Sequence, residues 1–425
     1  MRKFVVLTLV LSFVLAPLAT LSVSAPAAAQ EEEKRWDGAD DLPVNPLPCG
    51  DEPAPAPEPK EYDGGQPVNP PDLAGKPITL VDVPKLIGIG YFAATTKGQQ
   101  EAAEELGNVT VTTDAPTEAN IDEQITFIDN YITRGVDGIL FAANDPVAIT
   151  PVLKKALEQG IHVVGYDANS MPEGREWFVN QAEFNGIAKA LLDSLAEEKG
   201  EDAKFGIVTS TFTTPNQARW IAEMWAYAKE CHPDMVWLET LEAQEDYNLS
   251  FEQANTLINK YGDELDGLFG MTSVATPATA DAVTQAGLCG EVAVVGLATP
   301  NAMKPFVNSG CVKSVVLWNP VDLGYAAVYV MRQVVDGNFK PGDTEVEAGR
   351  LGKLRSSTAA KFCLARPSST PPTTSTTSTS RPDRLERQPL PHSCGQGLPP
   401  RRLLHLDCLR PGMKLQIADC EFRML

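Results

Sequence analysis

The chain has 425 residues, a formal net charge of −21 and a sequence pI of about 4.6. This length suffices for two or three domains with substantial cores. Because so acidic a surface repels phosphate backbones, we expect no nucleic-acid partner.

Residues 1–29 have the features of a secretory signal peptide. Arg2 and Lys3 precede an apolar run that ends in the small residues Ala27–Ala29. A membrane anchor is the alternative, but Pro17 and the alanine-rich end favour cleavage. We find no later stretch apolar enough to span a bilayer. The sequence therefore predicts an exported protein, either periplasmic or associated with the extracellular cell surface.

The rest of the chain divides by composition. Residues 30–78 are rich in proline, glycine and acidic side chains, which predicts a disordered linker. From residue 79 to 354, β-rich segments alternate with amphipathic helices such as Ile121–Arg134, a pattern typical of parallel sheets covered by helices. The predicted strands lie in residues 85–92, 109–115, 138–144, 162–168, 177–181, 204–210, 235–241, 268–273, 292–298 and 312–318. Ten strands predict two α/β lobes with a ligand cleft between their strand ends.

The segment from Gly88 to Ala93 matches G-x-G-x-x-G/A, and Asp114 follows at a suitable distance for a dinucleotide fingerprint. In that fingerprint the glycines form the turn after the strand. Here Gly88 and Gly90 alternate with apolar residues, so we expect them inside a strand. We therefore interpret the glycines as structural and expect no dinucleotide cofactor.

Polar and aromatic side chains follow the predicted strands. Such carboxylates, amides and aromatic rings suit the hydroxyls and C–H faces of a sugar. Asp145 and Asn216 have the alternative role of helix caps, and Lys85 that of a solvated lysine, whereas Asp167 precedes a loop. The candidate ligand-binding residues are Lys85, Phe92, Asp145, Asp167, Asn169, Gln181, Asn216, Gln217, Pro277, Thr279, Trp318 and Asn319.

Several segments, among them PKLIGIGYF, VDGILFAANDP, HVVGYDANS and TPNQARWIAEM, resemble type I periplasmic sugar-binding proteins, most closely the rhamnose- and autoinducer-2-binding branch. The resemblance implies an α/β fold of two doubly wound parallel-sheet lobes joined by a hinge. We place these lobes at residues 79–181 plus 322–340 and 182–321 plus 341–354. It also implies a monomeric, extracytoplasmic solute-binding protein of an ABC importer, which delivers a monosaccharide to the permease subunits.

The autoinducer-binding members hold their ligand with a lysine, two aspartates, a glutamine, a proline and an alanine. The matching residues here are Lys85, Asp167, Gln217 and Pro277. Asn216 replaces the second aspartate and Thr279 replaces the alanine, so the resemblance favours a rhamnose-like sugar. An autoinducer-2-type receptor remains an alternative, as does a secreted carbohydrate-acting enzyme. We expect no enzyme, because no nucleophile or acid–base motif is present.

The cysteines predict disulfides rather than a metal site, since no Cys/His cluster has metal-ligand spacing. Cys289 and Cys311 each precede a predicted strand, and an exported protein permits a bond between them. Two buried thiols are the alternative. Cys231 has no clear partner, although Cys49 is possible.

Residues 355–425 change to a composition rich in serine, threonine, proline and arginine. A glycosylated or disordered tail is one interpretation. The other is a frameshift, because back-translation of this region in a shifted frame permits a terminus like that of the family. On this hypothesis the tail is disordered and one lobe lacks its last strand.

Overall fold

The computed structural model describes residues 42–50, 61–358, 361–363 and 414–417. The predicted signal peptide and most of the predicted tail lie outside these residues. None of the helices in the described part combines the length and the apolar character that crossing a membrane requires.

The first lobe is built on an eight-stranded sheet in the order β11-β12-β13-β5-β4-β3-β1-β2. Strands β1 to β5 pair in parallel, whereas β12 pairs antiparallel with β11 and β13. The strands are β1 (Ile78–Val83), β2 (Val109–Thr113), β3 (Gly138–Phe141), β4 (His162–Tyr166), β5 (Trp177–Asn180), β11 (Glu345–Glu347), β12 (Lys353–Thr358) and β13 (Lys361–Cys363).

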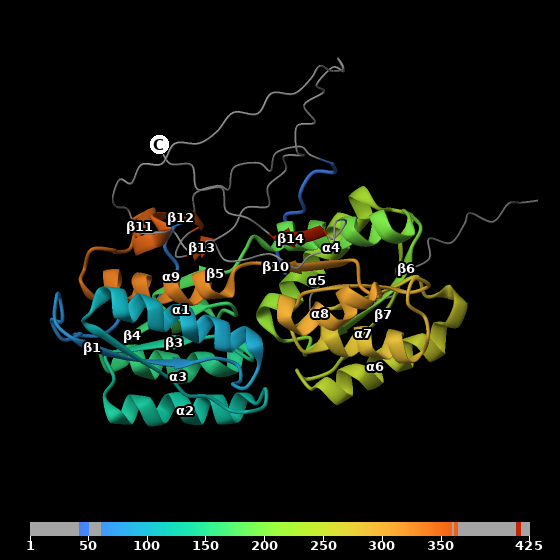
Figure 1. The fold of residues 1–425 in the computed structure, drawn as a ribbon. Helices are drawn as coiled ribbons and strands as arrows, with labels where there is room; N and C mark the ends of the chain where they lie inside the picture. The colour runs from blue at the N-terminus through green and yellow to red at the C-terminus, as the bar shows by residue number, and fades with distance from the viewer. Residues whose placement is uncertain (1–41, 51–60, 359–360, 364–413, 418–425) are drawn as a thin grey trace, which may run out of the picture. The chain divides into compact units, whose positions relative to one another are not determined.

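Helices cover both faces of this sheet (Figure 1). One face carries α1 (Gly90–Leu106) and α9 (Pro320–Val335), which lie side by side, and the other carries α2 (Ile121–Arg134) and α3 (Pro146–Glu158). Short 3₁₀ turns η1 (Pro172–Gly174) and η3 (Gly349–Leu351) complete the lobe.

The second lobe is built on a parallel sheet in the order β7-β6-β8-β9. A parallel bridge from Leu297 to Val316 joins β10 to its edge, and β14 pairs with β10. The strands are β6 (Lys204–Thr209), β7 (Val236–Glu242), β8 (Gly267–Gly270), β9 (Ala293–Gly296), β10 (Ser314–Leu317) and β14 (Lys414–Ile417). The helices are α4 (Phe184–Lys199), α5 (Pro215–Cys231), α6 (Tyr247–Tyr261), α7 (Ala275–Gln285), α8 (Pro300–Ser309) and the turn η2 (Gly262–Glu264).

The expected α/β class with parallel sheets is confirmed, but the first predicted strand is wrong. Residues 85–92 form a loop and the start of α1, and the strand is β1, seven residues earlier. Gly88 has a φ of +91°, a left-handed conformation that interrupts a strand. The glycines therefore do lie in the turn after a strand, so their position gives no reason to reject a nucleotide. The ligand class must come from the side chains around the site.

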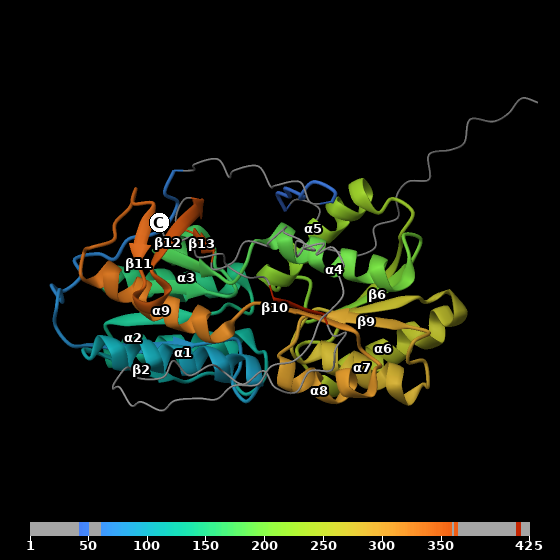
Figure 2. The same cartoon turned by 45° about the horizontal axis from the view of Figure 1, so that its top comes forward.

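The lobe boundaries differ from the expectation at the second and third crossings. The chain crosses between lobes after Gln181 and again at 318–319, whereas the expectation places these crossings near Gln181 and Asp322. The expected third crossing near residue 340 is wrong. Residues 345–358 stay in the first lobe, because β12 pairs through β13 with β5 (Figure 2).

The expected linker is packed in its described parts, 42–50 and 61–77. Leu47 is only 8% exposed, and the Tyr62 hydroxyl donates to the Glu176 backbone oxygen at 2.9 Å. Composition alone missed these few anchoring residues. In the predicted tail, β13 and β14 are strands of the structure, so β10 has a partner there. The frameshift and the disorder of the other tail residues lie outside the described part.

Candidate functional site

A cavity of about 40 Å³ lies where strand-end loops of the two lobes meet. The first lobe contributes the loop after β1, the first turn of α1 and the residue after β4. The second lobe contributes α5 and the loops after β7, β8, β9 and β10. This is the place where α/β folds bind ligands. The cavity is lined by Lys85, Ile89, Tyr91, Phe92, Asp167, Asn216, Gln217, Trp220, Glu245, Met271, Thr272, Ser273, Leu297, Leu317 and Trp318.

A buried ion pair occupies the centre of the site. The Lys85 Nζ lies 3.6 Å from the Asp167 Oδ2, and both side chains are 3% exposed. Lys85 also donates to the Asn216 Oδ1 at 3.0 Å, and the Asn216 Nδ2 donates to the Asp167 Oδ2 at 3.3 Å. Asn216 of the second lobe thus forms hydrogen bonds with both charged groups of the first lobe, and a buried ion pair needs such additional hydrogen bonds.

The electrostatics of Asp167 are set by two opposing effects. Burial raises the pKa of its carboxyl group, and the charge of Lys85 acts against that rise. Its backbone has a φ of +59°, which is unusual outside glycine and common at functional sites. The fold thus holds this carboxylate in the cavity at a cost in backbone strain.

Aromatic side chains form one side of the site. The Tyr91 hydroxyl donates to the Asp167 Oδ1 at 2.7 Å and accepts from the Trp318 Nε1 at 2.8 Å. The rings of Trp318 and Trp220 lie 5.6 Å apart, and Phe92 packs edge-on against Tyr91. Burial raises the pKa of Tyr91 well above its usual range, so its hydroxyl stays a donor. Such rings suit the apolar C–H faces of a sugar.

A second carboxylate enters the cavity from the loop after β7. The Glu245 Oε1 accepts from the Gln217 Nε2 at 3.2 Å, and the Gln217 Oε1 accepts from the Thr209 hydroxyl at 2.6 Å and from the Ser210 N–H at 2.8 Å. Gln217 therefore fixes the loop after β6 as well as lining the site. Glu245 has a φ of +55°, and burial raises its pKa.

The structure brings together half of the candidate residues. Those that line the cavity are Lys85, Phe92, Asp167, Asn216, Gln217 and Trp318. Those that do not line it are Asp145, Asn169, Gln181, Pro277, Thr279 and Asn319.

The six outlying residues have other places in the fold. Asp145 caps α3 by accepting from the N–H groups of residues 147 and 148, and Asn319 caps α9 in the same way. Asn169 accepts from the Arg175 Nε at 3.1 Å. Gln181, Pro277 and Thr279 are buried, with the last two inside α7. The helix-cap alternative thus describes Asp145 correctly, whereas the side chain of Asn216 faces the ion pair.

Sequence reasoning missed several lining residues. The sequence predicts Tyr91 in a strand, whereas it lies in the first turn of α1. Trp220 lies four residues after Asn216 on α5, so helical periodicity places both on one face. Glu245 follows β7, and the rule that ligands bind beyond strand ends would have found it if applied to that strand.

Within the described residues, two disulfides join cysteines that the sequence singles out. Cys289 bonds Cys311, as predicted, with their Cα atoms 4.7 Å apart. Cys231 bonds Cys49, with their Cα atoms 5.3 Å apart, which settles the partner that the sequence left open.

Comparisons with known proteins agree with this architecture. A family model described as the periplasmic binding protein domain matches residues 81–339. The D-ribose/D-allose-binding protein of Pseudomonas aeruginosa is 29% identical over 207 residues, which are 45% of this chain and 61% of that protein. The chain thus matches about three fifths of that relative's length.

Solved structures give similar matches. A sugar ABC transporter protein from Actinomyces odontolyticus is 28% identical with a TM-score of 0.56, covering 69% of this chain and 95% of that one. An ABC transporter solute-binding protein from Clostridium phytofermentas, with bound L-rhamnose, is 25% identical with a TM-score of 0.65, covering 68% and 94%. Because the family match spans more than half of the sequence and reaches both lobes, the chain belongs to the periplasmic binding protein family, whose structural neighbours here are type I sugar-binding proteins of ABC transporters.

Proposed function

We propose that this chain is an exported, monomeric solute-binding protein that holds a monosaccharide in the cavity and delivers it to the permease subunits of an ABC importer. The observation that carries the proposal is the buried pair of Lys85 and Asp167, which Asn216 bridges from the other lobe. Donors and acceptors held this close suit the alternating hydroxyls of a polyol.

Binding requires a change of shape. Ligand pockets usually enclose roughly 300 Å³ or more, whereas this cavity holds about 40 Å³. A sugar must therefore displace the contacts that Asn216 makes with Lys85 and Asp167 as the lobes separate, and the hydroxyls then replace those contacts when the lobes close. Hinge motion of this kind is a known response of two-lobed proteins.

Of the two candidate ligand classes, the site favours a neutral rhamnose-like sugar over an autoinducer-2-type ligand. Asn216 offers both a donor and an acceptor where the autoinducer-binding members have an aspartate. The substitution at Thr279 has no weight in this choice, since Thr279 does not line the cavity. The apolar C–H faces and methyl group of a deoxy sugar suit Tyr91, Phe92, Trp220 and Trp318, which supports the same ligand class.

A thermal-shift screen with L-rhamnose, D-ribose and D-allose tests the proposal. A sugar present at 100 times its Kd stabilises the folded state by about 2.7 kcal/mol, which raises the melting temperature. We expect Asp167→Ala to abolish that rise. Asp145→Ala is the control, because it removes a helix cap outside the cavity, at a cost of about 1 kcal/mol, and keeps the rise.

Two results would count against the proposal. If Asp167→Ala keeps the full thermal shift, the cavity is not the binding site. If the sugar recovered after incubation is chemically changed, the chain is an enzyme rather than a transport receptor.

A further inference from the structure

The residues that precede β1 are fixed to both lobes. We propose that this N-terminal strap, residues 42–50 and 61–77, limits how far the lobes separate, with the disulfide between Cys49 and Cys231 as its fastening. The inference is independent of which ligand the cavity takes, because it concerns the motion of the lobes.

The first anchor lies on the second lobe. Cys49 is bonded to Cys231 at the end of α5. The Asn45 N–H donates to both carboxylate oxygens of Glu223 at 3.0 and 3.1 Å, and the Asn185 side chain donates to the Asn45 backbone oxygen at 2.8 Å. A covalent bond and hydrogen bonds to α4 and α5 thus hold residues 42–50 on this lobe.

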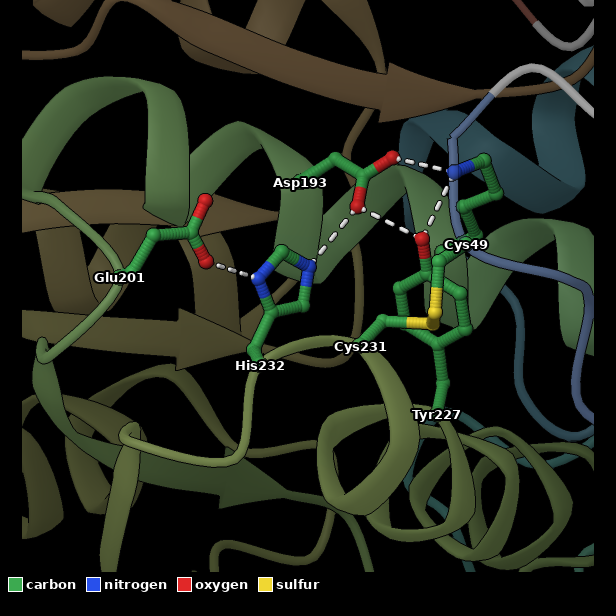
Figure 3. The surroundings of a disulfide bond; sticks show 7 residues. Cys49, Asp193, Glu201, Tyr227, Cys231 and His232 are labelled. Carbon is green, nitrogen blue, oxygen red and sulfur yellow. Dashed lines mark hydrogen bonds and ion pairs between the residues drawn. A yellow bond between two sulfur atoms is a disulfide. The ribbon is translucent and has the colours of Figure 1, made fainter.

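Hydrogen bonds within the second lobe surround the disulfide of this anchor (Figure 3). His232, next to the disulfide, lies between Asp193 of α4 and Glu201, with its Nε2 3.0 Å from the Asp193 Oδ1. The Tyr227 hydroxyl donates to the same oxygen at 3.0 Å. The hydrogen bond that Asp193 accepts raises the pKa of His232, which favours the protonated imidazole and its ion pairs. These contacts fix the end of α5 to α4.

The second anchor lies on the first lobe. The Tyr62 hydroxyl donates to the Glu176 backbone oxygen, and its ring packs against Trp177 of β5 at 5.1 Å. The Arg175 Nη1 lies 3.1 Å from the Asp63 Oδ1, and the Gly65 N–H donates to the Arg175 backbone oxygen at 2.9 Å. These contacts attach the strap to the start of β5.

The strap continues along this lobe to β1. The Val68 N–H donates to the Leu157 backbone oxygen at 2.8 Å, which fixes the strap to the end of α3. Arg332 of α9 donates to the backbone oxygens of Leu73 and Lys76 at 3.0 and 2.9 Å. Residues 61–77 therefore move with the first lobe.

A consequence follows for the hinge. Two crossings already connect the lobes, after β5 and after β10. The strap adds a third connection, because only ten residues, 51–60, lie between its two anchors. A segment of ten residues spans at most about 36 Å when fully extended, so it sets an upper limit on the separation of the two anchors. The strap therefore acts on the open form and leaves the closed form unchanged.

The two disulfides allow a matched test. The double variant Cys49→Ser/Cys231→Ser releases the strap, whereas Cys289→Ser/Cys311→Ser breaks a disulfide within the second lobe. Fluorophores introduced through unnatural amino acids at Glu158 of α3 and Lys304 of α8 report the separation of the lobes by single-molecule energy transfer. Without sugar, we expect the first variant to show a lower mean transfer efficiency and a broader distribution, and the second to match the wild type.

A second variant distinguishes two roles of the disulfide. It either connects the lobes through the strap or only stabilises the second lobe locally. A protease site of equal length replaces residues 51–60, and the folded protein is cut there with both disulfides intact. Cutting must reproduce the change seen in Cys49→Ser/Cys231→Ser if the strap is a tether. If neither the cut protein nor that variant differs from the wild type, or if only the disulfide variant differs, the proposal is wrong.

Discussion

At the scale of single residues, Asp82 is a buried carboxylic acid beneath α1. It lies in β1, is 0% exposed and accepts from the Thr113 hydroxyl at 3.2 Å. Burial raises its pKa to about 7 from an ordinary value of 3.8. Its native form therefore keeps a proton over much of the pH range in which an exposed aspartate is ionised.

This shift makes the free energy of unfolding depend on pH. Between about pH 4 and pH 7 the native carboxyl binds a proton that the unfolded one has lost, so stability falls as the pH rises. Asp82→Asn keeps the size of the side chain and lacks the charge. At pH 8 we expect the variant to be more stable than the wild type by up to about 4 kcal/mol, and at pH 4 the two should be similar.

Urea unfolding at pH 4 and pH 8 measures this difference. Asp72→Asn is the control, since the Asp72 side chain is 86% exposed, and we expect it to keep the pH dependence of the wild type. An identical pH dependence in Asp82→Asn and the wild type would show that Asp82 is ionised in the native state.

At the scale of elements, regular periodicity decided what the sequence could predict. Helix α2 has the predicted bounds because Ile121, Ile125, Ile128 and Ile132 recur on one face. The prediction of the first strand was wrong because the apolar residues around Gly88 have the pattern of a strand. The turn there depends on the positive φ of Gly88, which the apolar pattern does not reveal. The prediction of the site was limited too. A position after a strand end predicts that a residue lies near the cleft, but it does not distinguish a helix cap such as Asp145 from a ligand-binding residue.

Helices α1 and α9 approach closely through two glycines. A Cβ added at Gly98 would lie 1.8 Å from the Val321 backbone oxygen, and one at Gly324 would lie 2.0 Å from the Thr95 backbone oxygen. Backbone atoms cannot give way as flexible side chains do. These positions thus set the spacing of the two helices that cover the first lobe.

Gly98→Ala tests this contact. Overpacking costs about 3 kcal/mol, and the better helix propensity of alanine recovers about 1 kcal/mol. We expect a net loss of about 2 kcal/mol in the free energy of unfolding, measured by urea denaturation. Gln100→Ala, on the exposed face of the same helix, should change it by less than about 0.5 kcal/mol. Equal effects in both variants would contradict the close approach.

At the scale of the whole molecule, Trp318 links the two lobes at a chain crossing. It lies between β10 and α9, its Nε1 donates to the Tyr91 hydroxyl of the first lobe, and its ring packs near Trp220 of the second. These contacts exist only while the strand ends lie together. The sequence could place the crossing but not this hydrogen bond, because the two residues are far apart in the chain.

Trp318→Phe removes that hydrogen bond and keeps an aromatic ring. The closed form should lose about 1 kcal/mol, so the Kd for a sugar identified in the screen should rise about fivefold. Trp237→Phe is the matched control, because the Trp237 Nε1 donates to the Thr240 hydroxyl at 3.0 Å within the second lobe alone. Both variants should lose stability to urea, but only Trp318→Phe should bind the sugar more weakly in titration calorimetry. If both variants bind it as the wild type does, the hydrogen bond between Trp318 and Tyr91 has no part in closing the lobes, and closure then depends on the contacts that Asn216 makes with Lys85 and Asp167.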